Sequence, residues 1–260
     1  MDTLLETSGV SKSYGSFHAL TDVSVAVGDG EFVSIVGPNG AGKTTLVNVI
    51  TGMTKPTAGQ VRFRGVDIGG IGPVELAKRG MARTFQLVNI FPGLSVRETL
   101  AVAVASRLGR IDNPFRSLRG DAQLHAAVEE VAEIFDLGSK LETGAATLSQ
   151  GEKKLLDVAS ALALRPEVIL LDEPTSGVST GDKHVIMRVL VGAARTAGVR
   201  AIIQVEHDMD LVARYSDRIV ALQEGRVLAD LPPSTFFEDP ALTAAVVGTR
   251  PPQMARSAAC

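Results

Sequence analysis

The sequence contains a single cysteine, Cys260, at its C-terminal end. One cysteine excludes an internal disulfide framework and a cysteine-based zinc site, and it fits a reducing compartment such as the cytoplasm. An excess of positive charge is also missing, because 26 basic and 29 acidic residues give a net charge of -3. A chain without an overall positive field does not attract nucleic acid, so nucleic acid is not an expected partner.

Long apolar runs are absent as well. No uninterrupted run approaches the roughly 20 residues that cross a bilayer, and acidic residues stand at the N-terminus, where a signal peptide carries basic ones. If the protein works at a membrane, we expect other chains to do the spanning. With 260 residues, 45% of them hydrophobic, the chain is long enough to bury a sizeable core.

The order of apolar runs and glycine turns indicates an α/β fold. Before residue 36, alternating residues with a turn at 28–30 indicate a hairpin-like antiparallel β element. The runs EFVSIV, EVILLD and RAIIQVEH are typical of buried strands in a parallel sheet. Between them, the stretches SVRETLAVAVASRL and DAQLHAAVEEVAEIFDLGSK predict helices without a strand, which indicates an inserted helical lobe.

These patterns predict a single domain over residues 4–248. We expect a core formed by 4–87 and 164–248, a helical lobe at about 88–163, and a flexible tail at 249–260. A connector inside the lobe, GRIDNPFRSLRG, holds three arginines against one aspartate: Arg110, Arg116, Arg119 and Asp112. We interpret it as a solvated loop, with contact to lipid headgroups or a partner as the alternative.

Residues 37–44, GPNGAGKT, match the phosphate-binding pattern G-x-x-x-x-G-K-[ST] between an expected strand and an expected helix. Glycines let backbone N–H groups wrap a phosphate, and the helix start adds partial positive charge. We expect Lys43 to reach the β and γ phosphates and the Thr44 hydroxyl to bind Mg²⁺. A plain glycine turn would leave the Lys-Thr pair unexplained. The expected nucleotide contacts here are Gly37, Pro38, Asn39, Gly40, Ala41, Gly42, Lys43, Thr44 and Thr45.

The segment VILLDEP, residues 168–174, is a second candidate element of the same site. It reads as a buried strand that delivers Asp172 and Glu173 at its carboxyl end, where ligands of open α/β sheets bind. Asp172 suits Mg²⁺, directly or through water. Glu173 is placed to accept a proton from a water that attacks the γ phosphate.

A third candidate element lies in TLSQGEKKLLDVASAL, residues 147–162, which predicts a polar turn running into a helix. The pattern SQGE, from Ser149 to Glu152, is a capping box. Backbone N–H groups and the serine hydroxyl at such a helix start form a second anion site of the same physical kind as the phosphate loop. A chain with two such sites could bind two phosphates.

Together, GPNGAGKT, VILLDEP and LSQGE resemble the motifs of the ATP-binding subunits of ABC transporters, over nearly the whole chain. The resemblance implies an ATP-hydrolysing P-loop core with a mixed sheet, and ATP and Mg²⁺ as cofactors. Tyr14 falls where the family places an aromatic that stacks on adenine, with a strand-packing tyrosine as the alternative. Gln86, in ARTFQ, matches the glutamine that touches Mg²⁺ and the attacking water. His207 matches the switch histidine that contacts the γ phosphate, whereas His18, His125 and His184 have no such placement and are expected at the surface.

The resemblance also implies a partner for the turn at residues 148–152. In the family, this helix start faces the γ phosphate held by the phosphate loop of a second chain. Two chains would pair head to tail, as a homodimer or with a related subunit, and the nucleotide would also contact Ser149, Gln150, Gly151 and Glu152. The sequence departs from the family twice: LSQGE replaces the usual L-S-G-G-Q, and residues 176–180, SGVST, lack the aspartate of S-x-L-D-P.

Two longer stretches, ARTFQLVNIFPGLSVRETLAVA and VEHDMDLVARYSDRIVALQEGRVLAD, look most like the ATPase subunits of branched-chain amino-acid importers and their relatives for other polar solutes. This likeness implies integral membrane permease subunits, a solute-binding protein that acts indirectly, and a peripheral position on the cytoplasmic face of the cell membrane. A coupling helix of the permease would dock at about residues 86–100. The apolar residues there suit a groove or, equally, the core: Leu87, Val88, Ile90, Phe91 and Leu94.

Two other functions compete with transport. A soluble ABC ATPase of translation or DNA repair is the main alternative, but the chain has one phosphate loop, no sustained heptads and no net basic charge. An unrelated P-loop kinase or regulatory ATP-binding module would leave LSQGE, Gln86 and His207 unexplained.

Overall fold

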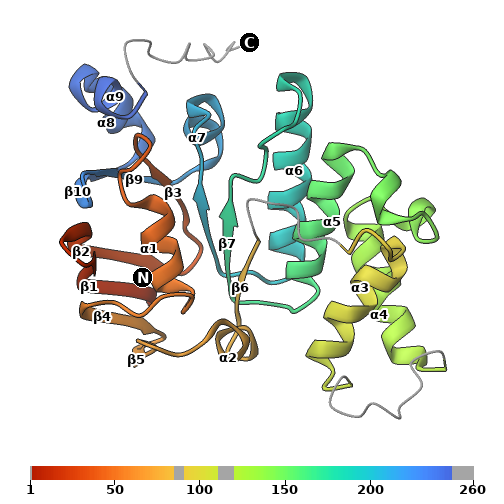
Figure 1. Ribbon diagram of the computed structural model, residues 1–260. Coiled ribbons are helices and arrows are strands. Elements are labelled where there is room, and N and C mark those ends of the chain that lie inside the picture. The colour runs from red at the N-terminus through yellow and green to blue at the C-terminus, as the bar shows by residue number, and fades with distance from the viewer. Residues whose placement is uncertain (1, 85–90, 111–119, 248–260) are drawn as a thin grey trace. The chain divides into compact units, whose positions relative to one another are not determined.

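The computed structural model describes residues 2–84, 91–110 and 120–247. The chain forms two compact units (Figure 1). Unit 1 consists of Met1–Pro73 and Ala201–Cys260, and unit 2 consists of Val74–Arg200. The predicted division into a core and a lobe at 88–163 stays a prediction, and the units are described separately below.

Unit 1 contains an antiparallel sheet with the strand order β2-β1-β4-β5. Its strands are β1 (Thr3–Tyr14), β2 (Phe17–Gly28), β4 (Ala58–Phe63) and β5 (Val66–Asp67). The predicted antiparallel β element is therefore confirmed, but the expected hairpin turn at 28–30 is wrong. The hairpin turns at residues 15–16, where Gly15 adopts a φ of 61°. Residues 28–30 instead lead from β2 into a strand of a different sheet.

The second sheet of unit 1 is mixed. Its strands follow the order β10-β9-β3-β8 and comprise β3 (Phe32–Val36), β8 (Ala201–Val205), β9 (Arg218–Gln223) and β10 (Arg226–Leu231). Strand β3 runs parallel to β8 and β9, whereas β10 is antiparallel to β9. Every residue of β3 and β8 is buried, which confirms the strands predicted from EFVSIV and RAIIQVEH.

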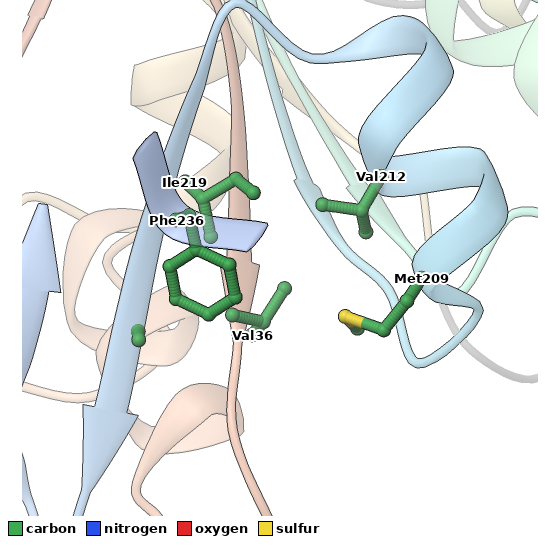
Figure 2. Packing of buried hydrophobic residues seen from close by; sticks show 6 residues of the cluster. Val36, Met209, Val212, Ile219 and Phe236 are labelled. Carbon is green, nitrogen blue, oxygen red and sulfur yellow. The ribbon is translucent and has the colours of Figure 1, made fainter. Parts of the chain in front are cut away.

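The helices of unit 1 are α1 (Lys43–Ile50), α7 (Met209–Tyr215), α8 (Pro233–Glu238) and α9 (Pro240–Val247). A buried cluster joins two of them to the mixed sheet: Val36, Met209, Val212, Ile219, Ala221 and Phe236. Figure 2 shows the ring of Phe236 beside Val36 and Ile219, with Val212 and Met209 reaching in from α7. The cluster anchors the last residue of β3, immediately before the glycine-rich loop.

Unit 2 contains two parallel strands, β6 (Met81–Arg83) and β7 (Val168–Asp172). Its helices are α2 (Pro73–Lys78), α3 (Val96–Arg107), α4 (Ala122–Ile134), α5 (Gln150–Leu162) and α6 (Thr180–Thr196), with short 3₁₀ turns at Gly138–Lys140 and Ala145–Thr147. Ser95 caps α3 with a capping box, and Asp121 caps α4. The helices predicted between 88 and 163 are confirmed, and the described part of that range holds no strand.

Several predicted features lie outside the described residues. They are Gln86, Leu87, Val88, Ile90, most of the connector with Asp112, Arg116 and Arg119, and the tail. At the described edge of the connector, Arg110 lies 3.2 Å from the carboxylate of Asp121. The predicted docking residues that the structure does describe are Phe91, which is 55% exposed, and Leu94, which is half-buried.

Candidate functional site

The predicted phosphate loop, Gly37–Thr44, joins β3 to α1 in unit 1. At two positions of this loop, only glycine fits sterically. Gly37 has a φ of 147°, and a Cβ there would lie 2.3 Å from the carbonyl oxygen of Leu222. Gly42 has a φ of 100°, and its Cβ would lie 2.7 Å from the oxygen of Ala19. The loop therefore fits so closely against β9 and the start of β2 that only glycine is compatible at these positions.

Backbone hydrogen bonds hold the loop against the turn between β9 and β10. The Gly225 N–H donates to the Ala41 carbonyl at 3.1 Å, and the Thr21 N–H donates to the Gly225 carbonyl at 2.8 Å. A residue from the β9–β10 turn thus connects the loop to strand β2. The loop's position is fixed by main-chain contacts from three separate parts of unit 1.

Lys43 is buried inside the loop, with only 7% of its surface exposed. Its Nζ donates to the carbonyl oxygens of Gly37 at 2.7 Å and Pro38 at 3.0 Å. Thr44 is exposed and Thr45 is half-buried in the first turn of α1, which contains no acidic residue. The loop therefore brings together an ammonium group, the N-terminus of a helix and an accessible hydroxyl. Phosphate-binding sites combine these groups.

His207 lies at the same edge of the mixed sheet as the phosphate loop. Strands β3 and β8 are parallel, and Ile35 pairs with Val205 near their carboxyl ends. Gly37 follows β3 in the chain and His207 follows β8. Both residues therefore lie at the carboxyl edge of the sheet, where ligands of such sheets bind. The His207 side chain is exposed, and its backbone N–H donates to the carboxylate of Glu206 at 2.9 Å.

Tyr14 ends strand β1 at the tip of the hairpin. Its side chain is not packed into the sheet, because the residue is 51% exposed. The ammonium of Lys12 lies 4.9 Å from the centre of the tyrosine ring, a cation–π distance. Tyr14 therefore combines an accessible aromatic ring with a nearby positive charge.

In unit 2, the carboxylate of Asp172 is held by a buried arginine at the end of β7. Arg83, the last residue of β6, donates from Nη2 to Oδ2 of Asp172 at 2.8 Å, with side chains only 9% and 6% exposed. Thr84 adds a second contact, because its hydroxyl accepts from the Asp172 N–H at 3.3 Å. A deeply buried ion pair holds both side chains in place, because the loss of one partner would leave the other as an uncompensated buried charge. The sequence reasoning missed Arg83, although it lies in the ARTFQ stretch quoted for Gln86.

Glu173, the next residue, begins a sharp turn. It has a φ of 48°, a left-handed conformation that is uncommon for any residue other than glycine. Its carbonyl oxygen accepts from the Ser176 N–H at 3.0 Å and from Nζ of Lys154 at 3.3 Å. Lys154 belongs to α5 and is 5% exposed. This second buried cation was also not foreseen from the sequence.

The turn at residues 148–152, here named the signature turn, opens α5 with the predicted capping box, which is confirmed. The Glu152 N–H donates to Oγ of Ser149 at 3.3 Å, and the Ser149 N–H donates to Oε2 of Glu152 at 2.8 Å. Ser149 and Gln150 are exposed. The other carboxylate oxygen of Glu152 pairs with Lys140. The negative charge that distinguishes LSQGE from LSGGQ is thus balanced within the same unit.

Each unit therefore gathers part of the predicted set. Unit 1 places the phosphate loop and His207 at one sheet edge, and unit 2 holds Asp172 through Arg83 and joins the Glu173 carbonyl to α5 through Lys154. The remaining histidines are exposed (His18) or half-buried (His125 and His184). In the three described stretches, no helix has the length and apolar character to cross a membrane.

Comparison with known proteins identifies the family of the chain. The family model described as ABC transporter matches residues 20–176. The high-affinity branched-chain amino acid transport ATP-binding protein BraF of Pseudomonas aeruginosa is 34% identical over 254 residues, covering 94% of this chain and 98% of BraF.

Solved structures agree with the family match. The ADP conformation of MJ1267, an ATP-binding cassette of an ABC transporter, superposes with a TM-score of 0.80 and 30% identity, covering 93% of this chain and 97% of that one. A dimeric post-hydrolysis state of the cassette MJ0796, bound to ADP and Pi, gives a TM-score of 0.73 and 26% identity, covering 88% and 98%. The predicted ABC ATPase fold is confirmed, and the chain belongs to the ABC transporter family, as one of its ATP-hydrolysing, ATP-binding subunits.

Proposed function

We propose that this chain powers the import of a branched-chain amino acid or a related polar solute through separate membrane subunits. The proposed solute class rests on the similarity to BraF, which extends over 94% of this chain. The chemistry rests on the phosphate loop with its buried Lys43. ATP and water are converted to ADP and phosphate, and the binding and loss of nucleotide drive the cycle.

Residues of unit 1 would bind the nucleotide. Residues 37–45 wrap the phosphates, with backbone N–H groups from every residue except Pro38, and the Lys43 ammonium exchanges its loop carbonyls for β and γ phosphate oxygens. The Tyr14 ring stacks on adenine, a contact worth roughly 0.5–1.5 kcal/mol beyond its buried area. His207 donates a hydrogen bond to the γ phosphate from its position at the edge of the same sheet.

The residues assigned to Mg²⁺ are Thr44, Gln86 and Asp172. A hydroxyl, an amide oxygen and a carboxylate are the hard oxygen donors that this ion prefers, and Asp172 is held at the carboxyl end of β7 by Arg83. The chemistry of these donor types thus suits the ion, and Gln86 lies outside the described residues. When bound, Mg²⁺ would offset negative charge on the β and γ phosphates.

Glu173 is the proposed general base. It accepts a proton from water as the water oxygen bonds to the γ phosphorus and the bond to the leaving ADP oxygen breaks. Glu173→Gln should therefore bind ATP with near-normal affinity and lose turnover. Hydrolysis that stays undiminished in this variant would remove Glu173 from the role.

We further propose that two chains pair head to tail, with the signature turn of one facing the γ phosphate on the loop of the other. The dimeric structure of the cassette MJ0796 supports pairing of two chains. Residues 149–152 then complete the site across the pair, which is a homodimer or includes a related subunit. ATP favours the closed pair, and hydrolysis weakens it.

A mixing experiment tests the pairing. Lys43→Ala and Ser149→Arg should each abolish ATP hydrolysis alone. In a mixed homodimer, one of the two sites combines an intact phosphate loop with an intact signature turn. Because half of the dimers in an equal mixture are mixed ones, mixing should restore up to about a quarter of the native activity. Absence of recovery would contradict homodimeric pairing and direct attention to a related second subunit.

The membrane partners are proposed as integral permease subunits, with a solute-binding protein acting through them, and the chain as peripheral on the cytoplasmic face. The exposed Phe91 and the neighbouring Leu94 would contribute to docking of a permease helix. Native protein should fractionate with membranes and release together with an integral partner. Co-sedimentation with ribosomes would instead favour the soluble translation ATPase.

A further inference from the structure

Lys154 is a buried lysine on the helix that begins at the signature turn. The residue is 5% exposed, and its Nζ lies 3.3 Å from the carbonyl oxygen of Glu173. A buried ammonium is costly unless it meets hydrogen-bond acceptors, so this contact is a fixed feature of the packing and not a surface ion pair.

The carbonyl that Lys154 contacts belongs to a residue in an unusual backbone conformation. Glu173 has a φ of 48°, which costs a non-glycine residue on the order of 1 kcal/mol. Two donors converge on its carbonyl, the Ser176 N–H from the following turn and Nζ of Lys154 from α5. Such contacts stabilise the rare conformation and thereby set the direction in which the Glu173 side chain leaves the backbone.

We propose that Lys154 is a positioning residue that orients the general base Glu173 and links it to α5, the helix that begins at the signature turn of the same chain. The inference rests on the proposed role of Glu173. Ser149 caps α5 and Lys154 lies near the start of the same helix, so a displacement of the signature turn would be transmitted to the Glu173 carbonyl. This link passes through a side chain of α5 and does not require the aspartate that the chain lacks at 176–180.

The first test compares Lys154→Met with Lys153→Met. Methionine has similar length and removes a buried charge, so we expect the variant to fold. We expect kcat for ATP hydrolysis to fall at least about tenfold, which corresponds to about 1.4 kcal/mol, while KM for ATP changes less than about twofold. The control Lys153→Met, at the half-buried neighbouring position, should keep both constants.

A role confined to folding would lower the melting temperature and leave kcat unchanged below it, which would overturn the proposal. If Lys154→Met does not fold, Lys154→Gln carries the same test. Glutamine keeps a donor that is one bond shorter and cannot restore the contact fully, so kcat should again fall with KM retained. Native kcat in either variant contradicts the inference.

A mixed dimer distinguishes two possible targets of Lys154. One is Glu173 of its own chain, and the other is the signature turn of its own chain, which serves the nucleotide site of the partner. A Lys43→Ala chain is mixed with a Ser149→Arg/Lys154→Met chain, whose phosphate loop and Glu173 then serve the single competent site. We expect this mixture to recover at most about one tenth of the activity that the mixture with native Lys154 recovers, in line with the tenfold fall in kcat. The reciprocal mixture, Lys43→Ala/Lys154→Met with Ser149→Arg, should recover activity, because its competent site uses a Glu173 with an intact Lys154.

The opposite pattern would place the effect of Lys154 in the signature turn and overturn the proposal. Two further results distinguish failure of the proposed function from failure of the proposal for Lys154. If Glu173→Gln hydrolyses ATP normally, the base is misassigned, and if the mixture of the two single variants with native Lys154 does not recover, homodimeric pairing fails. In that second case, the comparison of kcat in Lys154→Met and Lys153→Met still decides the inference.

Discussion

The phosphate loop of unit 1 and the end of β7 in unit 2 are held in place by different means. The loop is fixed by main-chain contacts, with glycines where a Cβ would overlap a backbone oxygen. The end of β7 is fixed by charged side chains, Arg83 on Asp172 and Lys154 on Glu173. The loop thus depends on close steric fit, whereas the end of β7 depends on buried cations, one at the Asp172 carboxylate and one at the Glu173 carbonyl.

This difference determines how each region responds to substitution. Backbone overlap is relieved only by moving the chain, so even one added methyl group is costly in the loop. A buried ion pair tolerates loss of both partners better than loss of one, because the cost comes from the charge left unpaired. The predictions that follow test this contrast in order of expected effect.

Gly37→Ala should produce the largest loss of stability. Its Cβ would lie 2.3 Å from the Leu222 oxygen at a φ of 147°, so we expect a loss of about 4–5 kcal/mol in the free energy of unfolding, or no folded protein. Gly40→Ala is the matched control, since its φ of 82° is also left-handed but, apart from its chain neighbours, no atom of the described residues lies within 4 Å of the added Cβ. Denaturant unfolding should show a loss of only about 1–2 kcal/mol for this control.

Arg83→Met should cost about 3–4 kcal/mol, because it leaves the buried Asp172 carboxylate without its arginine. Adding Asp172→Asn to this variant should recover part of the stability, measured by denaturant unfolding in a double-mutant cycle. The control is Arg79→Met, whose partner Glu75 is 52% exposed and whose loss should cost less than about 1 kcal/mol. Equal losses for the two arginines would contradict the view that the buried charge of Arg83 holds the end of β7.

The sequence predicts those parts of the site whose partners are close in the chain. The phosphate loop and the capping box each lie within a few residues, and both local structures are found where they are expected. Contacts of Arg83, Lys154 and Lys140 span 89, 19 and 12 residues, and they depend on which strands and helices become neighbours. The misplaced hairpin has the same cause, because glycines at 15 and at 28–30 mark turns equally well and only the sheet decides which strands pair.

Ser149→Ala should cost about 1 kcal/mol, since it removes the side-chain half of the capping box. The Glu152 half remains, because the acceptor for the Ser149 N–H is the glutamate carboxylate. Thermal unfolding should therefore show a modest shift, far below that of Gly37→Ala. A shift as large as the one for Gly37→Ala would mean that the signature turn also depends on shape.

Lys140→Ala should have the smallest effect on stability, below about 1 kcal/mol and smaller at high salt, because the Lys140 side chain is 40% exposed. Its effect on nucleotide should be larger than its effect on folding. The uncovered Glu152 charge would repel the γ phosphate and raise KM for ATP, and Glu152→Gln in the same chain should restore it. A raised KM that persists in the double variant would contradict this electrostatic explanation.

The parallel pairing of β3 and β8 also has a geometric consequence. Ile35 and Val205 are partners, so Gly37 and His207 each stand two residues beyond the same rung of the sheet. A residue inserted between Val205 and His207 would move the histidine one position further from the rung that Ile35 and Val205 share. The position of the imidazole at this edge therefore depends on its two-residue spacing from the end of β8 as well as on the identity of the residue.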